Sequence, residues 1–443
     1  MEVLVLGAGY VGLVQAAGLA SAGNDVNLID ISKEKIELLE AGGCPIFEPG
    51  LKELLSIGHG KGYLKFYHSE GAEFLEKMLN ADICFIAVGT PQGSDGHADL
   101  KYLYSAAEML LKLGSKLNNK LLVIKSTVPV GTGDKIEEFF RSKGFSPKIV
   151  SNPEFLKQGA AVQDFLKPER VIVGTDDEEA KKILHFLYKP FMMKRERLVF
   201  MSRKSAELVK YACNAFLATK ISFINEISRL SELVGADIQE IREGMISDSR
   251  IGDQFLFPGI GYGGSCLPKD TQALMAQGKA AGISMGIVEA TDRVNQYQKN
   301  WMLEKISKYF KGELSGRTIT VWGLSFKPNT DDLRDAPSVY LLKDLFKAGA
   351  KVHAHDPAAM DNIRVLFKSE IDKGSLKLFD NPYEAAAHSN VLAVLTEWQE
   401  YRTPNLKKLA KLLSDHTIFD GRDIYENAML KKFGFTHYGV GMV

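Results

Sequence analysis

The stretch that decides the fold is MEVLVLGAGYVGLVQAAGLASAGNDVNLID, residues 1–30. A short apolar strand turns at Gly7, Gly9 and Gly12, a helix rich in alanine and glycine follows, and a second strand ends at Asp30. GxGxxG spacing alone is a weak signal, but here it lies between a strand and a helix and is followed by an acid, as dinucleotide binding requires. The run lacks the basic N-terminal region of a signal peptide, and glycines interrupt it too early for a membrane span. It therefore predicts the start of a Rossmann-like sheet.

The glycine turn and Asp30 predict NAD as the cofactor. Glycines let the backbone approach a pyrophosphate at the N-terminus of a helix, where free N–H groups and the helix dipole favour an anion. A carboxylate at the end of the second strand binds the adenosine ribose and repels a 2′-phosphate, which favours NAD over NADP. The residues expected to contact NAD in this stretch are Gly7, Gly9, Tyr10, Val11, Gly12 and Asp30.

Composition narrows the class of ligand. At 443 residues the chain suggests about two to four domains. Its 55 lysines and arginines balance 55 acidic residues, so the net charge favours a small molecule over nucleic acid or an anionic membrane as partner. The cysteines show no CxxC pair and no cluster, which argues against a disulfide framework and a metal site and indicates a reducing cytoplasm: Cys44, Cys84, Cys213 and Cys266.

Three further apolar runs end in polar residues. Thr90 follows ADICFIAVG, Thr127 follows KLLVIKS, and Glu154 follows PKIVSNP. Each could be only a turn or helix-capping residue. In a parallel α/β sheet, however, the carboxyl ends of the strands form the ligand-binding crevice, so we expect all three side chains to line one cleft.

From Ser202 to Gly235 apolar residues recur three and four positions apart, which predicts one helix of about thirty residues. Such a helix often packs against a second copy of the chain, and a homodimer through this region is expected. Lys210 and Asn214 are four positions apart and share one face of the helix. A solvated lysine beside an asparagine is the simpler interpretation of that pair taken alone.

A second α/β block begins near Arg317, with strand-like runs in RTITVWGLSFKPN, AKVHAHDP, NVLAVLTEW and HTIFDGR. It has no GxGxxG, so we expect a different nucleotide, contacted by Lys327 and Arg422. The predicted fold is α/β, with two Rossmann-like doubly wound parallel-sheet domains joined by a central helical domain with one long helix. The expected domains are 1–201 for NAD, 202–312 for the helices and the cysteine loop, and 313–443 for the second nucleotide.

The loop GIGYGGSCLPKD, residues 259–270, sets Cys266 among glycines. Oxidising an alcohol to an acid requires a tetrahedral adduct from which a second hydride can leave, and a thiolate supplies it through a thiohemiacetal and a thioester. Lys269 and Lys210 could lower the pKa of the thiol or stabilise an oxyanion, and Asp270 could position a water. The simpler interpretation is a flexible loop that contains a small apolar residue.

Seven motifs in order along the chain resemble the UDP-glucose/GDP-mannose dehydrogenase family: GAGYVG, VGTP, STVPVGT, NPEFL, FLFPGIGYGGSCLPKD, SFKPNTDDLRDAPS and DGR. The resemblance extends from Met1 to the C-terminus. It implies four-electron oxidation of a nucleotide sugar at C6, with two NAD reduced per sugar. UDP-glucose is the substrate that the motifs favour; GDP-mannose and a UDP-N-acetylhexosamine are the alternatives.

The resemblance also implies roles for individual residues. Cys266 would be the nucleophile, Asp270 would hold the catalytic water, and Glu154 would assist hydrolysis of the thioester. Lys210 and Asn214 would stabilise charge on the C6 oxygen and bind the sugar. The implied catalytic set is Cys266, Lys210, Asn214, Asp270, Glu154 and Thr127.

Substrate and cofactor contacts are implied by the same motifs. In dimeric members an arginine sixteen residues before the cysteine reaches the neighbouring subunit's substrate; here it is Arg250. The implied substrate contacts are Glu154, Phe155, Leu156, Lys210, Asn214, Arg250, Phe255, Leu256, Phe257, Pro258, Gly259, Tyr262, Gly263, Phe326, Lys327 and Arg422. Further contacts to NAD are implied for Lys35, Thr90, Thr127, Glu154, Lys269 and Arg334.

One position departs from the family pattern. Many members have glutamate where this chain has Gln158, and a neutral amide cannot act as a base, which leaves hydrolysis to Glu154 and Asp270. Two other classes of protein fit the sequence less well. A short-chain epimerase or dehydratase would need Tyr-x-x-x-Lys, a spacing that the sequence lacks. A non-catalytic nucleotide sensor could share the fold, but would not need Lys210, Asn214, Cys266 and Asp270 together.

Overall fold

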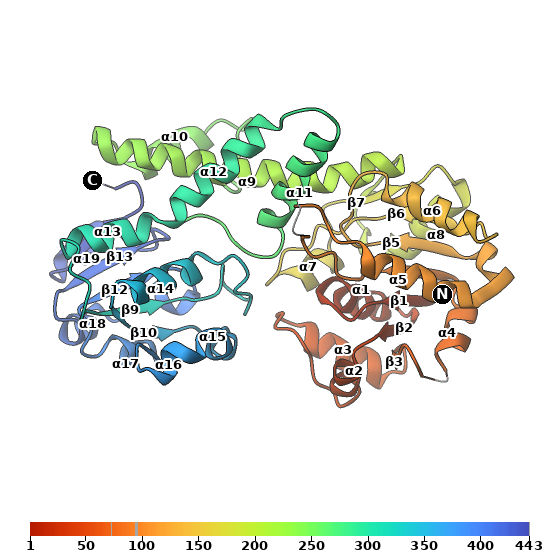
Figure 1. Ribbon diagram of the computed structural model, residues 1–443, viewed down its shortest axis with the longest axis horizontal. Helices are drawn as coiled ribbons and strands as arrows, with labels where there is room; N and C mark the ends of the chain where they lie inside the picture. Colours follow the sequence, from red (N-terminus) through yellow and green to blue (C-terminus); the bar gives the residue numbers. More distant parts are fainter. Residues whose placement is uncertain (72, 94–95, 443) are drawn as a thin grey trace. The chain divides into compact units, whose positions relative to one another are not determined.

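The computed structural model describes residues 1–71, 73–93 and 96–442 (Figure 1). These residues form two compact units, which we call unit 1 (residues 1–213 and 276–281) and unit 2 (residues 214–275 and 282–443). The predicted long helix is present as α9 (Arg203–Val234). Both α9 and α11 (Leu267–Ala280) contribute residues to each unit.

Unit 1 contains an eight-stranded sheet in the order β3-β2-β1-β4-β5-β6-β7-β8. Its first six strands follow the 3-2-1-4-5-6 order of the Rossmann fold and pair in parallel. The last two strands are parallel to each other, but β7 pairs antiparallel with β6. The strands are β1 (Glu2–Leu6), β2 (Asp25–Asp30), β3 (Leu64–His68), β4 (Ile83–Ile86), β5 (Leu121–Ile124), β6 (Lys148–Ser151), β7 (Val171–Gly174) and β8 (Leu198–Met201).

Helices bury both faces of this sheet. In β1, Val3 and Val5 pack into one apolar cluster, while Leu4 and Leu6 pack into another, because alternate side chains of a strand point to opposite faces. Burial on both faces explains why the strand is an unbroken apolar run. The first face is covered by α1 (Tyr10–Ser21), α2 (Lys33–Glu40), α3 (Leu51–Gly60), α7 (Ala161–Leu166) and α8 (Glu178–Tyr188), and the second by α4 (Phe74–Asn80), α5 (Lys101–Leu110) and α6 (Thr132–Ser142).

Unit 2 contains a six-stranded parallel sheet in the order β11-β10-β9-β12-β13-β14, which is again the Rossmann order. The strands are β9 (Thr318–Trp322), β10 (Lys351–His355), β11 (Leu376–Leu378), β12 (Val391–Val394), β13 (Thr417–Asp420) and β14 (Thr436–Gly439). The helices on one face are α13 (Trp301–Tyr309), α14 (Pro337–Lys347), α15 (Met360–Leu366) and α16 (Lys368–Asp372), and those on the other are α17 (Pro382–Ala386), α18 (Leu406–Leu412) and α19 (Asn427–Lys432). The prediction of two Rossmann-like domains with a helical region is confirmed.

The helical part of unit 2 also holds the C-terminal segment. Ile224 of α9 and Ile238 of α10 (Ile238–Ile246) form a small apolar cluster with Leu256, and α12 (Gly286–Lys299) precedes α13. The backbone of Gly441 donates to the carboxylate of Glu232 at 3.0 Å. This bond ties the last described residues to the C-terminal half of α9.

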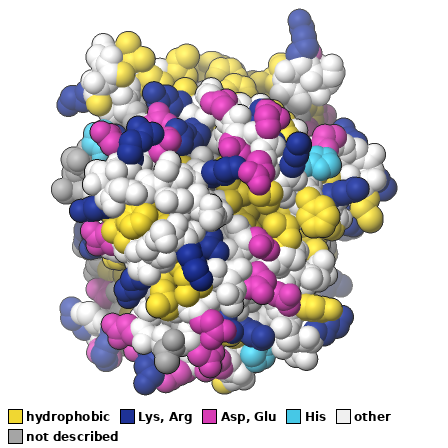
Figure 2. Space-filling view, turned by 90° about the vertical axis from the view of Figure 1, so that its right-hand side faces the viewer, with side chains coloured by type: hydrophobic (Ala, Val, Ile, Leu, Met, Phe, Trp, Pro, Cys, Tyr) yellow, Lys and Arg dark blue, Asp and Glu magenta, His cyan; other side chains and the backbone are white. Residues whose placement is uncertain are grey.

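No helix in the described ranges combines the length and the apolar character that a membrane span requires. On the face of the molecule shown in Figure 2, basic and acidic side chains are interspersed rather than gathered by sign. That distribution agrees with the balanced composition and gives this face no broad field that would attract a polyanion.

Candidate active site

The glycine turn after β1 is held close to the neighbouring strands. Gly7 has a φ of 106° and donates its N–H to the carbonyl of Ile29 at 2.7 Å. A Cβ on Gly7 would lie 2.7 Å from the carbonyl oxygen of Ala87, and one on Gly12 would lie 1.8 Å from that of Gly7. Both positions therefore require glycine. The turn leads directly into α1 (Tyr10–Ser21), and the backbone N–H groups in the first turn of this helix are available to a pyrophosphate.

Asp30 ties the end of β2 to this turn. One carboxylate oxygen accepts from the backbone N–H of Ala8 at 2.5 Å, and the other accepts from Ser32 at 2.8 Å. The carboxylate thus lies at the edge of the sheet where the adenosine ribose of a dinucleotide would rest. The glycine cradle, the helix N-terminus and this acid together fit NAD.

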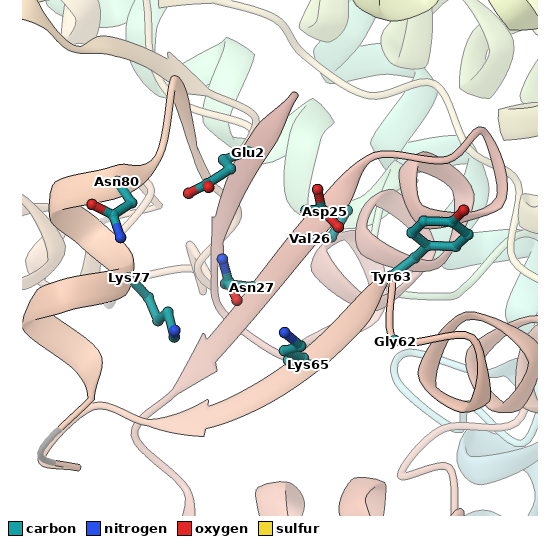
Figure 3. A pocket seen from close by; sticks show the side chains of 9 residues that line it. All are labelled: Glu2, Asp25, Val26, Asn27, Gly62, Tyr63, Lys65, Lys77 and Asn80. Carbon is teal, nitrogen blue, oxygen red and sulfur yellow. The ribbon is translucent and has the colours of Figure 1, made fainter.

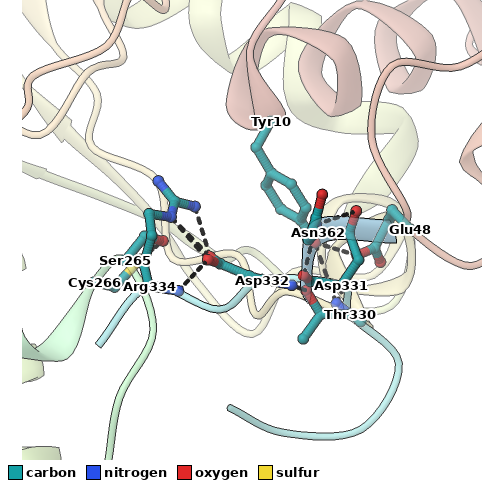
Figure 4. Close-up of polar contacts among 10 residues, drawn as sticks. Tyr10, Glu48, Ser265, Cys266, Thr330, Asp331, Asp332, Arg334 and Asn362 are labelled. Atoms are coloured by element: carbon teal, nitrogen blue, oxygen red, sulfur yellow. Dashed lines mark hydrogen bonds and ion pairs between the residues drawn. The ribbon is translucent and has the colours of Figure 1, made fainter. Parts of the chain in front are cut away.

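Tyr10, which was predicted to contact NAD, has its hydroxyl hydrogen-bonded within unit 1. Its hydroxyl donates to Glu48, whose carboxylate also accepts from the backbone of Gly159 at 2.6 Å and of Ala161 at 2.7 Å. Burial, followed by the neighbouring carboxylate, raises the pKa of Tyr10. Glu48 stands in a loop with no motif around it, so no local signal in the sequence marks it. Figure 4 shows Tyr10 and Glu48 side by side.

The three polar residues predicted to share a cleft all follow neighbouring strands. Thr90 comes after β4, Thr127 after β5 and Glu154 after β6, and these strands are adjacent in the sheet. The hydroxyl of Thr90 donates to the carbonyl of Thr127 at 2.8 Å. The carboxyl ends of the strands therefore do bring the three segments to one edge, as parallel-sheet topology requires.

Glu154 forms a buried ion pair with Lys210 of α9 at 2.9 Å. The carboxylate also accepts from the backbone of Leu156 at 2.6 Å. Burial raises the pKa of Glu154, but the charge and hydrogen bond of Lys210, the backbone bond to Leu156 and the charge of Lys125 together outweigh it and hold the pKa below its ordinary value. The centre of the Phe155 ring lies 4.5 Å from the guanidinium of Arg170 and 5.2 Å from the ammonium of Lys210.

Two buried charged residues nearby were missed from the sequence. Lys125 follows β5 and contacts Asn152 and Tyr188. Glu207 of α9 accepts from the backbone of Gly131 at 2.6 Å and of Gly133 at 2.8 Å, and so caps the N-terminus of α6. A lysine placed directly after an apolar strand was the available signal for Lys125, whereas nothing local marks Glu207, because its partners are distant in sequence.

In unit 2, Cys266 directly precedes α11, and its loop packs tightly on the segment after β9. A Cβ on Gly263 would lie 2.3 Å from the carbonyl oxygen of Asp335, and one on Gly264 would lie 2.7 Å from the ring of Phe326. Close packing therefore requires glycine at both positions, in addition to any need for a flexible loop. The thiol is partly buried, with the hydroxyl of Ser265 at 3.6 Å.

Asp270 lies in the first turn of α11 and is 1% exposed. Its carboxylate accepts from the side-chain amide of Asn214 at 2.6 Å and from the ammonium of Lys269, also at 2.6 Å. Its backbone N–H donates to the carbonyl of Cys266 at 2.9 Å. Asp270 thus links the cysteine loop to α9, and three predicted site residues, Asn214, Lys269 and Asp270, share one network.

Arg334 lies beside the cysteine loop, as Figure 4 shows. Its carbonyl accepts from the backbone of Gly264 at 2.8 Å, and its guanidinium binds the carboxylate of Asp332 at 2.8 and 2.6 Å. Hydrogen bonding to Asp332 raises the pKa of Arg334, and the negative charge of a Cys266 thiolate adds to this effect.

The predicted nucleotide contacts also meet within unit 2. The backbone of Gly259 donates to the side chain of Asn225 at 2.8 Å, which fixes the FLFPG segment. A Cβ on Gly259 would lie 3.2 Å from the guanidinium of Arg422. Arg422 in turn donates to the carbonyl of Phe326 at 3.3 Å, and Lys327 places its ammonium 5.6 Å from the Phe326 ring.

Other predicted positions lie apart from these groups. The side chain of Arg250 is 88% exposed and pairs with Asp248 in its own loop. Lys35 lies in the first turn of α2, where its backbone bonds to Ser32. Within the described ranges, no cluster of histidine, cysteine and acidic side chains is arranged to hold a metal.

A small polar pocket of about 130 Å³ lies at the opposite ends of the unit 1 strands (Figure 3). Glu2 and Asp25 begin β1 and β2, whereas the glycine turn and Asp30 lie at the carboxyl ends of those strands. This pocket is therefore separate from the predicted cofactor site.

Models of three domains of one family match the chain. The NAD binding domain of the UDP-glucose/GDP-mannose dehydrogenase family matches residues 1–192, the central domain matches 204–297, and the UDP binding domain matches 320–427. The chain belongs to this family. Its membership confirms the resemblance seen in the motifs, makes the protein an NAD-dependent oxidoreductase, and rules out the short-chain epimerase interpretation.

Relatives in the UDP-glucose/GDP-mannose dehydrogenase family match from end to end. A UDP-glucose 6-dehydrogenase of Pseudomonas aeruginosa is 43% identical, over 100% of this chain and 97% of the relative. One of Rhizobium meliloti is 41% identical, over 100% and 99%. The structure of a UDP-glucose dehydrogenase from Pyrobaculum islandicum superposes with a TM-score of 0.87 at 36% identity, covering 100% of this chain and 98% of that one.

Proposed function

We propose that the protein oxidises UDP-glucose at C6 to UDP-glucuronate, with two NAD reduced per sugar nucleotide. The observation that carries the proposal is Cys266, set directly before α11 in a loop of obligatory glycines, with Asp270 bound by Asn214 and Lys269 one turn away. The names of the relatives at 43% and 41% identity favour UDP-glucose over GDP-mannose or a UDP-N-acetylhexosamine as the substrate.

Bound NAD would supply the hydride acceptor, held by the turn from Gly7 to Gly12 and by Asp30. The first oxidation removes a hydride from C6 and the hydroxyl proton, leaving an aldehyde. The Cys266 thiolate then forms a C–S bond to that carbon, and loss of a second hydride turns the adduct into a thioester. Water breaks the C–S bond, which yields the carboxylate and regenerates the thiolate.

The remaining chemistry needs charge stabilisation and a base. Lys210 is suited to stabilise the developing oxyanion, because a buried ammonium strengthens electrostatic interactions. The carboxylates of Glu154 and Asp270 are the groups available to accept a proton from the attacking water, since Gln158 is a neutral amide. Asn214 orients Asp270 through its 2.6 Å hydrogen bond, and Thr127 lines the same end of the sheet as Glu154.

The second sheet would bind the uridine diphosphate. Lys327 and Arg422 supply cations, and Phe326 and the segment from Phe255 to Gly259 supply apolar and backbone contacts. We also propose the domain limits 1–201, 202–312 and 313–443, and a cytoplasmic location, which suits the four cysteines, none of which forms a disulfide in the described chain.

We further propose a homodimer through α9. Phe216, Phe223 and Leu230 recur every seven residues and are 66%, 48% and 54% exposed, so they leave an apolar stripe along the helix. A second copy covering this stripe would give Arg250 a partner chain to reach. Sedimentation of Phe223→Asp should give a monomer, whereas an unchanged sedimentation coefficient would contradict the interface.

The reaction is tested by the yield of NADH from limiting UDP-glucose, GDP-mannose and UDP-N-acetylglucosamine in parallel. About two NADH per UDP-glucose, with little from the others, supports both the four-electron route and the substrate. One per sugar would mean that Cys266 is not the acyl carrier, and none from any sugar would favour a nucleotide sensor. Cys266→Ala should lose turnover by about a thousandfold or more, whereas the control Cys213→Ala should not.

A further inference from the structure

Lys125 is a buried lysine of unit 1 to which the proposed mechanism assigns no role. It directly follows β5 and is 6% exposed. Its ammonium donates to the side-chain oxygen of Asn152 at 3.1 Å and to the hydroxyl of Tyr188 at 3.3 Å, and lies 5.6 Å from the centre of the Tyr188 ring. Neither partner is a carboxylate. Burying a charge with only neutral partners is costly, so the position calls for an explanation.

The segment that Lys125 contacts carries Glu154. Asn152 and Glu154 both follow β6, which pairs in parallel with β5, and Ile124 lies opposite Ser151 in the ladder. The negative charge of Glu154 is what chiefly favours the protonated form of Lys125, and the charge of Lys125 in turn lowers the pKa of Glu154. Glu154 therefore lies within the influence of two buried cations: Lys210, which contacts it directly, and Lys125, which is hydrogen-bonded to Asn152 two residues before it.

Lys125 can change its charge near neutral pH. Burial lowers its pKa to about 8, against the attraction of Glu154. In the described part of unit 1, the titratable groups facing Lys125 and Glu154 are Lys210 of α9, Tyr10 of α1 and Tyr188 of α8. Burial raises the pKa of both tyrosines, so they stay neutral across this range.

We propose that Lys125 is a positioning residue whose ammonium keeps Glu154 ionised and oriented for hydrolysis of the thioester. It touches neither substrate nor cofactor in this role and acts only through Glu154. With Lys210 and the backbone of Leu156 alone, the buried carboxylate would take up a proton at higher pH and could act as a base over a narrower pH range. The catalytic consequence rests on the proposed function, but the electrostatic pairing of Lys125 with Glu154 does not.

The test compares Lys125→Met and Lys125→Arg with a matched control, Lys120→Met. Lys120 directly precedes β5, and its partly buried ammonium donates to the carbonyls of Leu79 and Ala81 at 2.7 and 2.5 Å. Replacing it removes a partly buried ammonium at the opposite end of the same strand. The midpoint of Glu154 titration is read by NMR of ¹³C-labelled glutamate carboxyls, with the signal assigned by its loss in Glu154→Gln.

We expect Lys125→Met to raise the Glu154 midpoint by about one pH unit, a tenfold gain in proton affinity. Lys125→Arg should restore the midpoint and Lys120→Met should leave it unchanged. The acid limb of the kcat profile for NADH formation should move to higher pH with the midpoint. An unshifted midpoint in Lys125→Met overturns the proposal, as does an equal loss of kcat at every pH in both methionine variants. A shifted midpoint in a chain that never oxidises UDP-glucose would uphold the pairing and refute only the proposed function.

Discussion

The first turns of the two sheets are built alike, although their sequences differ. After β1, Gly7 has a φ of 106° and donates its N–H to the carbonyl of Ile29, the next-to-last residue of β2, at 2.7 Å. After β9, Gly323 has a φ of 89° and donates to the carbonyl of His355 at 2.9 Å, the last residue of β10. A Cβ on either glycine would collide with the segment after the neighbouring strand, at Ala87 and Thr396. Equal topology thus imposes the same backbone device twice.

An acid completes each turn. Asp30 accepts from the backbone of Ala8 at 2.5 Å, and Asp356 accepts from the backbones of Leu324 and Ser325 at 2.6 and 3.0 Å. Both follow or end the second strand of their sheet. Asp356 is 2% exposed and also accepts from the indole of Trp398, whereas Asp30 is only partly buried. In unit 2 the acid, Asp356, is therefore used up by hydrogen bonds within the protein. In unit 1 the acid, Asp30, remains accessible to a ligand.

The two turns lead into different backbone structures. In unit 1, α1 begins at Tyr10, three residues after Gly7, so a helix N-terminus faces the ligand. In unit 2, a loop intervenes and α14 begins only at Pro337. A diphosphate at the second turn must then meet side-chain cations such as Lys327 instead of helix N–H groups. The shared fold fixes where a nucleotide binds, and the turn residues decide how it is bound.

The largest effect should come from replacing the two acids by alanine. Asp356→Ala leaves several buried donors without an acceptor and should cost about 3 kcal/mol or more of the free energy of unfolding of unit 2. Asp30→Ala should cost much less stability. It should weaken the binding of NAD about tenfold, with little effect on the binding of UDP-glucose. All three tryptophans, Trp301, Trp322 and Trp398, lie in unit 2, so their fluorescence in urea reports that unit alone. Similar urea midpoints for the two variants would mean that Asp356 does not stabilise unit 2 more than Asp30 does.

The comparison extends to the buried lysines. Lys299 in unit 2 pairs with Asp335 at 2.7 Å, whereas Lys125 in unit 1 has only neutral hydrogen-bond partners. Burial in the folded chain lowers the pKa of Lys125 to about 8. Between pH 8 and about pH 10.5, the folded chain therefore binds fewer protons than the unfolded chain. Raising the pH through this window should therefore stabilise the wild type relative to Lys125→Met by up to about 3 kcal/mol. A flat difference, measured by urea unfolding at each pH, would mean that Lys125 is not buried as a charge.

Most of the fold was predictable from the sequence, because strand, turn and helix signals are local. The apolar runs before Thr90, Thr127 and Glu154 mark β4, β5 and β6, and the long helix is marked by its periodicity. The antiparallel step from β6 to β7 was not predictable, since it depends on sheet packing. Nor were the partners of the site residues: Glu154 was expected in a cleft, but its contact with Lys210 and its coupling to Lys125 arise only when distant segments meet.

Replacing each turn glycine by alanine tests whether the two turns depend equally on a left-handed backbone. Gly7→Ala and Gly323→Ala both force a side chain into a left-handed backbone and into a contact shorter than 3 Å, so each should destabilise its own unit by about 2 kcal/mol. Gly7→Ala should weaken the binding of NAD and leave the affinity for UDP unchanged. Gly323→Ala should weaken the binding of UDP and leave the affinity for NAD unchanged. Alanine at the exposed turn position Gly62, which has a φ of 76° and no atom within 4 Å of its Cβ, controls for backbone strain alone. Calorimetric titration with each nucleotide separates the outcomes.

The smallest effect concerns charge at the second turn. If side-chain cations bind the diphosphate there, Lys327→Met should weaken the binding of UDP about tenfold. This loss of affinity should be smaller at high salt, because the interaction is electrostatic. NAD at the first turn is held by backbone N–H groups, so its affinity should not change. The control is Lys347→Met, since Lys347 lies at the end of α14 and pairs with Asp344 on the surface. Equal losses in the two variants, or a matching loss for NAD, would mean that the loop after Gly323 does not bind the diphosphate through its cations, and the contrast between the two turns would then rest on their backbones alone.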